Sequence, residues 1–135
     1  MNSREGLAPR RRRATIEDVS VDGYGRTPSV SIDDVPVDVT EGVVLLDVRE
    51  DDEWAQGHAP GALHIPMEDV PARLDEIDMD ANLFVICRQG GRSLVVVDYL
   101  NQIGFEAVNV AGGMVAWQNR GRPLTADGDG PASVY

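Results

Sequence analysis

The centre of the fold is encoded in residues 83–104, LFVICRQGGRSLVVVDYLNQIG. The apolar, β-branched run Leu83–Ile86 predicts a buried strand. Apolar residues recur at helical spacing over Leu94–Ile103, and Gly104 supplies a stop signal, so this segment is predicted to be a helix. The single cysteine of the chain, Cys87, is therefore expected in a tight loop between a strand and the N-terminus of a helix.

The loop after that strand has the composition of a site for a reactive thiolate. Gly90 and Gly91 allow successive backbone N–H groups to converge on one point as an anion-binding nest. The first-turn amides of the helix add partial positive charge, and Arg88 and Arg92 add two permanent cations. These surroundings favour the thiolate of Cys87 over the thiol. A cysteine that only fills core space would not call for paired glycines and arginines, so we interpret Cys87 as a nucleophile.

Length and composition restrict the class of protein. With 135 residues and a net charge of -11, the chain is expected to form one domain and to avoid nucleic acid and anionic membranes as partners. One cysteine permits no internal disulfide, and no apolar run approaches the length of a membrane-spanning helix. The arginines at 10–13 are followed by ATIED and not by the apolar segment of a signal peptide, so a cytoplasmic protein is expected.

The remaining segments predict strands that alternate with helices. Residues 1–27 are polar and rich in arginine, which predicts a flexible tail, and residues 126–135 are predicted to be a loose tail after a domain of residues 28–125. The predicted strands are a weak edge strand within 28–39 and then 43–48, 62–65, 83–86 and 107–110. The predicted helices are 51–56, a segment that begins at Pro66 with Val70, Leu74 and Ile77 as its apolar face, 94–103 and 114–119. The alternation predicts an α/β fold with a mainly parallel sheet and with the reactive loop at the carboxyl end of a strand.

Three motifs in this order resemble those of the rhodanese family of sulfurtransferases. They are DVREDDEWAQGHAPGALHIP at 47–66, CRQGGRS at 87–93 and GGMVAWQNRGRP at 112–123. The resemblance spans about residues 29–124, and its one small departure is Ala59, where the family usually has Ile or Val. It implies a single rhodanese-like domain with a five-stranded, mainly parallel sheet flanked by helices on both faces.

The same resemblance implies a thiosulfate sulfurtransferase that needs no cofactor and no metal. Cys87 would attack a small anionic donor such as thiosulfate, and the resulting persulfide would pass its outer sulfur to cyanide, a thiol or a partner protein. Asp47 and Arg49 would support the loop, and a salt bridge between Arg49 and Glu53 is expected. The residues implied to bind the substrate are Arg88, Gln89, Gly90, Gly91, Arg92 and Ser93.

The histidines and tryptophans of the first and third motifs are interpreted as structural. His58 and His64 match positions that belong to the fold signature, and together with Cys87 they are too few for a closed structural metal site. Trp54 and Trp117 are interpreted as anchors in the core.

Two other functions stay open at this level. Phosphatases with a related fold have five residues between the cysteine and the arginine of their loop, whereas four residues separate Cys87 from Arg92. The shorter loop is expected to fit one sulfur atom and to be too tight for a phosphate, which argues against a phosphatase or arsenate reductase. The second alternative is an interaction module or sulfur relay, with residues 1–27 as its docking element.

Overall fold

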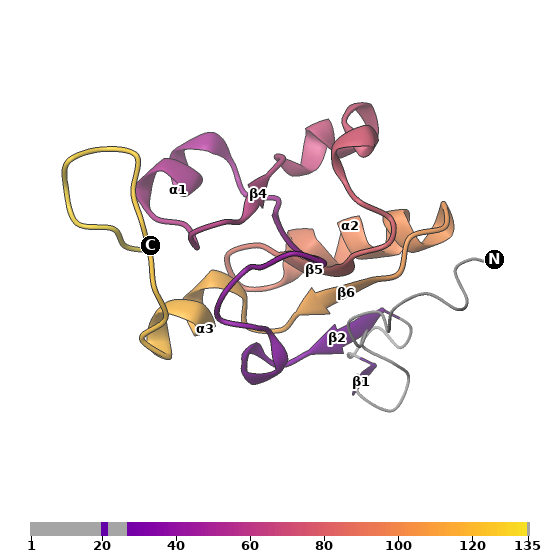
Figure 1. The fold of residues 1–135 in the computed structure, drawn as a ribbon, viewed down its shortest axis with the longest axis horizontal. Coiled ribbons are helices and arrows are strands. Elements are labelled where there is room, and N and C mark those ends of the chain that lie inside the picture. Colours follow the sequence, from indigo (N-terminus) through magenta and orange to yellow (C-terminus); the bar gives the residue numbers. More distant parts are fainter. Residues whose placement is uncertain (1–19, 22–26, 135) are drawn as a thin grey trace.

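The structure is a computed structural model that describes residues 20–21 and 27–134 (Figure 1). Its strands are β1 (Ser20–Val21), β2 (Pro28–Val30), β3 (Val43–Asp47), β4 (Leu63–His64), β5 (Asn82–Ile86) and β6 (Ala107–Val110). Its α-helices are α1 (Asp51–Gln56), α2 (Gly91–Gln102) and α3 (Gly113–Asn119), and its 3-10 helices are η1 (Ile32–Asp34), η2 (Met67–Ala72) and η3 (Leu74–Glu76).

One sheet contains all the strands, in the order β1-β2-β6-β5-β3-β4. Every pair from β2 to β4 is parallel, so the predicted five-stranded parallel sheet is confirmed. β1 adds a sixth, antiparallel strand by pairing Ser20 with Ser29 and Val21 with Pro28, which covers the open edge of β2. The prediction of a flexible tail is therefore wrong for residues 20–21, and residues 1–19 and 22–26 lie outside the described part.

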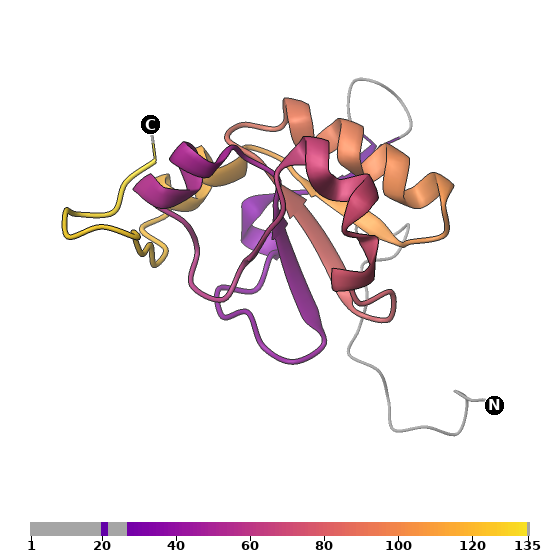
Figure 2. The same cartoon turned by 90° about the horizontal axis from the view of Figure 1, so that it is seen from above.

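Helices lie on both faces of the sheet (Figure 2), and the core forms two layers, one on each face. This arrangement follows from the alternation of side chains along buried parallel strands. One layer joins the sheet to η1 and α3, with Leu45, Phe84, Ile86, Val108, Met114 and Trp117 among its members. The other layer joins it to η2 and α2, with Leu46, Leu83, Val85, Val70, Val97 and Leu100 among its members. Cys87 belongs to the second layer, beneath α2.

Two predicted helices differ from the observed ones. The segment after Pro66 is not an α-helix but the two 3-10 helices η2 and η3, although Val70 and Ile77 are buried as expected. Pro71 lies inside η2, and its ring and missing N–H disfavour a continuous α-helix. α2 begins at Gly91, three residues before the predicted start, so the loop after Cys87 is shorter than expected.

The C-terminal segment, predicted to be loose, is held against the domain. The backbone N–H of Asp127 donates to the carbonyl of Ala55 at 3.0 Å, and the N–H of Ser133 donates to the carbonyl of Gln56 at 3.1 Å. Val134 is buried in the layer that contains α3. The carbonyls at the end of α1 have no partners within their own helix, and this segment supplies two of the donors that they need.

Candidate active site

The sulfur of Cys87 lies at the carboxyl end of β5 and is held by the loop that leads into α2. The side chain is 1% exposed. The backbone N–H of Gly90 donates to Sγ at 3.1 Å, and Oγ of Ser93 lies 3.3 Å from Sγ. Gly90 precedes α2 with φ of +135°, a conformation that glycine adopts without strain. A backbone donor and a hydroxyl therefore converge on one sulfur atom.

The residues predicted to bind the substrate occupy different depths of this loop. Gly90 and Ser93 contact the sulfur, and Ser93 is fully buried. Gln89 and Gly91 are exposed at the surface of the loop, and Arg88 is half-buried beside Cys87. The loop thus presents backbone and polar groups of several residues around a sulfur that is itself almost closed off from solvent.

The glycine pair of the third motif positions the loop from the other side. The N–H groups of Met114 and Val115 in α3 donate to the carbonyls of Cys87 and Arg88, at 2.8 and 3.0 Å. A Cβ atom on Gly113 would lie 2.4 Å from each of these two carbonyl oxygens. The start of α3 can therefore approach the reactive loop only if residue 113 has no side chain.

Replacing Gly113 by alanine is expected to displace the loop and to destabilise the fold. Its φ of +56° and its contact with two carbonyls both oppose a side chain. The matched control is Gly121→Ala, because Gly121 has φ of +70° but no atom near the added Cβ. We expect the control to lose about 1–2 kcal/mol of unfolding free energy, and Gly113→Ala to lose about 1–3 kcal/mol more. Urea denaturation measures both, and equal losses would contradict the role of crowding.

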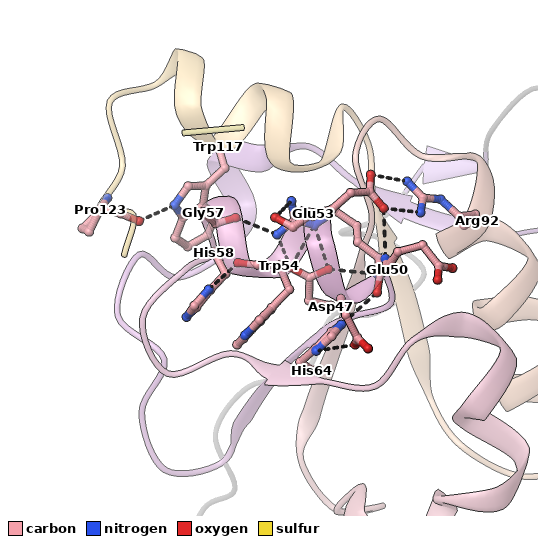
Figure 3. Close-up of polar contacts among 12 residues, drawn as sticks. Asp47, Glu50, Glu53, Trp54, Gly57, His58, His64, Arg92, Trp117 and Pro123 are labelled. Carbon is pink, nitrogen blue, oxygen red and sulfur yellow. Dashed lines mark hydrogen bonds and ion pairs between the residues drawn. The ribbon is translucent and has the colours of Figure 1, made fainter. Parts of the chain in front are cut away.

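Arg92 forms an ion pair with α1. Its NH1 and NH2 groups donate to Oε1 and Oε2 of Glu53 at 2.6 and 2.9 Å, in a bidentate arrangement (Figure 3). Hydrogen bonding to Arg92 lowers the pKa of Glu53 to about 2. This pair therefore stabilises the fold fully above the ordinary range of a glutamate and loses its contribution as the pH falls through about 2. The predicted salt bridge between Arg49 and Glu53 is therefore wrong, because the Glu53 carboxylate binds Arg92. The positive charge of Arg92 is in turn balanced by Glu53.

Arg49 pairs with Asp47 below the loop. Its Nε lies 2.9 Å from Oδ1 of Asp47 and its NH2 lies 2.7 Å from Oδ2, with both side chains 1% exposed. NH2 also donates to the carbonyl of Gly57 at 2.9 Å, and NH1 donates to that of Glu53 at 3.3 Å. Arg49 therefore contacts the middle and the C-terminal end of α1, and α1 in turn presents Glu53 to Arg92. Asp47 and Arg49, the residues predicted to support the loop, are thus linked to it through α1 and the Glu53–Arg92 ion pair.

The two histidines pack against one tryptophan. The ring of Trp54 stacks on those of His58 and His64, with centroid distances of 3.6 and 4.6 Å (Figure 3). His58 donates from Nδ1 to the carbonyl of Trp54, and His64 donates from Nε2 to that of Arg49. Trp54 is half-buried in this stack and belongs to neither core layer, so its interpretation as a core anchor is wrong. Within residues 20–21 and 27–134, no group of histidine, cysteine and acidic side chains is arranged to hold a metal ion.

Trp117 has the position predicted for it. Its side chain is fully buried in the layer that contains α3, and its Nε1 donates to the carbonyl of Pro123 at 2.8 Å. The third motif therefore combines a core anchor with Gly113, which lies against the loop.

Comparison with known proteins identifies this arrangement. The family model for the Rhodanese-like domain matches residues 33–120, which include β3 to β6, the Cys87 loop and α3. The chain belongs to the rhodanese-like domain family. The Bacillus subtilis protein YtwF is 45% identical to this rhodanese-like domain over 87 residues, which make up 64% of the present chain and 84% of YtwF.

Other relatives agree in sequence and in fold. A protein of Allochromatium vinosum named Sulfurtransferase is 43% identical over 88 residues, or 64% of this chain and 82% of that protein. The crystal structure of a rhodanese-like domain protein from Staphylococcus aureus superposes with a TM-score of 0.61 at 38% identity, and the match covers 66% of this chain and 89% of that one. In the described part of the present domain, no helix is long and apolar enough to cross a membrane.

Sequence reasoning missed two residues that this rhodanese-like domain places around the loop. One is Glu53 as the partner of Arg92, from which it is separated by 39 positions. The other is Asn109, which receives a hydrogen bond from Ser93. The only sequence signal for Asn109 is a polar residue within the otherwise apolar strand Ala107–Val110.

Proposed function

We propose that this rhodanese-like domain is a sulfurtransferase whose nucleophile is Cys87. The observation that carries the proposal is the N–H of Gly90 directed at Sγ from 3.1 Å, at the point where β5 ends and α2 begins. A preorganised donor at that point stabilises negative charge on sulfur in the thiolate and in a persulfide. The name of the Allochromatium vinosum relative gives the same class of reaction.

The proposed reaction has two half-reactions with one covalent intermediate. The thiolate of Cys87 attacks the outer sulfur of thiosulfate or of a similar anionic donor. A new S–S bond forms to Sγ, the old S–S bond breaks, and its electron pair leaves with sulfite. A thiol, cyanide or the thiolate of a partner protein then attacks the outer sulfur and regenerates the Cys87 thiolate.

The loop residues have distinct roles in this proposal. Gly90 and Ser93 contact Sγ directly, and Arg88 and the exposed Gln89 and Gly91 surround the approach of the donor. Arg92 is bound to Glu53, so we assign to it the shape of the loop more than attraction of the donor. The same contact disfavours a phosphatase, whose loop arginine has to face the phosphate.

The intermediate can be tested by mass spectrometry. We expect the protein, after treatment with thiosulfate and desalting, to carry one additional sulfur atom on the peptide that contains Cys87. Because the chain has a single cysteine, the persulfide has no second thiol in the protein with which to form a disulfide. Intact-mass measurement under non-reducing conditions detects the adduct, and cyanide should remove it.

Two parallel samples make this experiment decisive. Protein treated with sulfite in place of thiosulfate should gain no mass, because sulfite has no outer sulfur to give. Turnover of thiosulfate without any adduct would refute the covalent route. Hydrolysis of an aryl phosphate, with no sulfur transfer from thiosulfate or 3-mercaptopyruvate, would favour the phosphatase instead.

A further inference from the structure

A row of buried polar side chains runs along the sheet from Cys87, across β6, to strand β2. Oγ of Ser93 lies 3.3 Å from Sγ, Oδ1 of Asn109 lies 2.5 Å from that Oγ, and Oγ of Ser29 lies 3.0 Å from Nδ2 of Asn109. These residues come from α2, β6 and β2, and none of them is more than 3% exposed. We call Ser93, Asn109 and Ser29 the polar relay. Buried in an apolar layer, each of its polar atoms requires a partner.

In the arrangement that the structure has, the hydrogen bonds of the polar relay run away from the sulfur. Ser93 has one hydroxyl proton and gives it to Oδ1 of Asn109, an atom that only accepts. Asn109 gives a proton from Nδ2 to the hydroxyl oxygen of Ser29. Towards Sγ, the oxygen of Ser93 is then left as an acceptor. This direction suits the protonated thiol of Cys87, whose S–H can donate to that oxygen.

The opposite direction suits the thiolate, which has no proton and needs a donor. A half-turn of the Asn109 amide exchanges its oxygen and nitrogen. Ser29 then donates to Oδ1, Nδ2 donates to Ser93, and the hydroxyl of Ser93 donates to Sγ. Hydroxyl and amide groups each both donate and accept, so the relay stays fully paired in either direction. An ionised carboxylate at position 109 could only accept hydrogen bonds, and an apolar side chain could neither donate nor accept them. Neither side chain could therefore replace the Asn109 amide in both directions.

We infer that the polar relay reverses its direction when Cys87 loses its proton, and that Asn109 is the positioning residue that turns. In the reversed state the Ser93 hydroxyl joins the Gly90 N–H as a second donor to the thiolate. Ser29, whose hydroxyl contacts Asn109, thereby influences the sulfur from β2 through two intervening side chains. The catalytic meaning of this relay rests on the proposed function, because the thiolate is the attacking form.

The pH at which the thiolate forms tests the relay without requiring sulfur transfer. It is read from the ultraviolet absorbance of the thiolate, after subtraction of the signal of the Cys87→Ser protein. In Ser93→Ala the reversed relay loses its hydroxyl donor to the thiolate, and this loss is expected to raise the titration midpoint by about one pH unit. Ser29→Ala removes the acceptor for Nδ2 of Asn109 in the thiol direction and the donor to Oδ1 in the thiolate direction. Its shift of the midpoint is the difference between these two losses and should be smaller than that of Ser93→Ala.

A double-mutant cycle distinguishes the relay from a general loosening of the fold. Once Ser93 is alanine, the additional change Ser29→Ala should leave the midpoint unchanged, because the connection to the sulfur is already broken. The matched control is Ser31→Ala, which removes a hydroxyl that accepts from the N–H of Asp33, two positions along the chain.

The charged groups of the loop and of the elements that support it are Arg88 and the pairs Arg92–Glu53 and Arg49–Asp47. They are the same in all these variants, so a difference in midpoint does not come from a change of charge.

Two results would overturn the relay. One is a Ser93→Ala midpoint no higher than that of the unmodified protein, because a relay that does not reverse gives the thiolate no hydroxyl donor to lose. The other is a measurable Ser29→Ala shift that keeps its size once Ser93 is alanine, or a shift of that size in Ser31→Ala. A protein that shows the expected midpoints but accepts sulfur from no donor would refute the proposed function and leave the relay supported.

Discussion

The Cys87→Ser protein is expected to fold normally and to lose sulfur transfer by a factor of at least about 10³. A serine hydroxyl at this buried position does not ionise at neutral pH, and its oxygen cannot carry the sulfane sulfur. The substitution nearly keeps the size of the side chain, and it keeps an acceptor for the Gly90 N–H and a hydroxyl that can donate to the Ser93 oxygen. Steady-state kinetics with thiosulfate and cyanide measure the loss, and thermal unfolding measures the fold.

A second variant shows whether any loss of activity in Cys87→Ser results from misfolding. Cys87→Ala removes the sulfur and leaves no polar group to disturb the apolar layer beneath α2. Both variants should be inactive, and at least one of them should unfold at nearly the temperature of the unmodified protein. Sulfur transfer by either variant in its folded state would contradict the assignment of Cys87 as nucleophile.

Replacing Arg49 by methionine should cost about 3–5 kcal/mol of unfolding free energy. Asp47 would then be left as a buried carboxylate without its guanidinium partner, since both side chains are 1% exposed. The carbonyls of Glu53 and Gly57 would lose a donor as well. Urea denaturation at neutral pH measures the loss, and Asp47→Asn combined with Arg49→Met should recover part of it by removing the unpaired charge.

The control for this experiment is another arginine pair of similar length. Arg73 lies 2.8 Å from Glu76, but their side chains are 37% and 40% exposed, so Arg73→Met should change the free energy of unfolding far less than Arg49→Met does. Equal effects at positions 49 and 73 would show that burial of the Asp47–Arg49 pair is not what makes it important to the fold.

The sequence predicted the central strand, the loop and the parallel sheet because each depends on local patterns. The apolar run Leu83–Ile86 fixes β5, and the glycines after Cys87 indicate a loop that closes on the sulfur. The cysteine at the end of a parallel strand then follows from the topology. These parts required no knowledge of which distant residues meet.

The partner of Glu53 could not be predicted from local spacing. Arg49 lies four positions away, a separation that favours pairing on a helix surface. However, Arg49 precedes α1 and is buried on Asp47, whereas Glu53 faces Arg92 at the start of α2. The choice between the two arginines is made by how α1 and α2 pack, which no short pattern encodes.

The same reason explains the errors at the C-terminus and at Trp54. Residues 126–134 contain glycine and aspartate and lack periodicity, yet their backbone satisfies the end of α1 and Val134 enters the core. Trp54 has the size of a core residue but lies on a helix with no buried side chain, between two histidines. In both cases the contact is made by segments that are brought together only in the folded chain.

The different positions of the two tryptophans give the protein two separate optical reporters. Trp117 is fully buried in the core, whereas Trp54 is only half-buried on α1, the helix that presents Glu53 to Arg92. A soluble collisional quencher should therefore reach the indole of Trp54 and spare that of Trp117. Changes in the quenched part of the emission would report local opening of α1 beside the reactive loop, and changes in the remainder would report global unfolding. The fluorescence of the unlabelled protein can thus distinguish motion near Cys87 from loss of the whole fold.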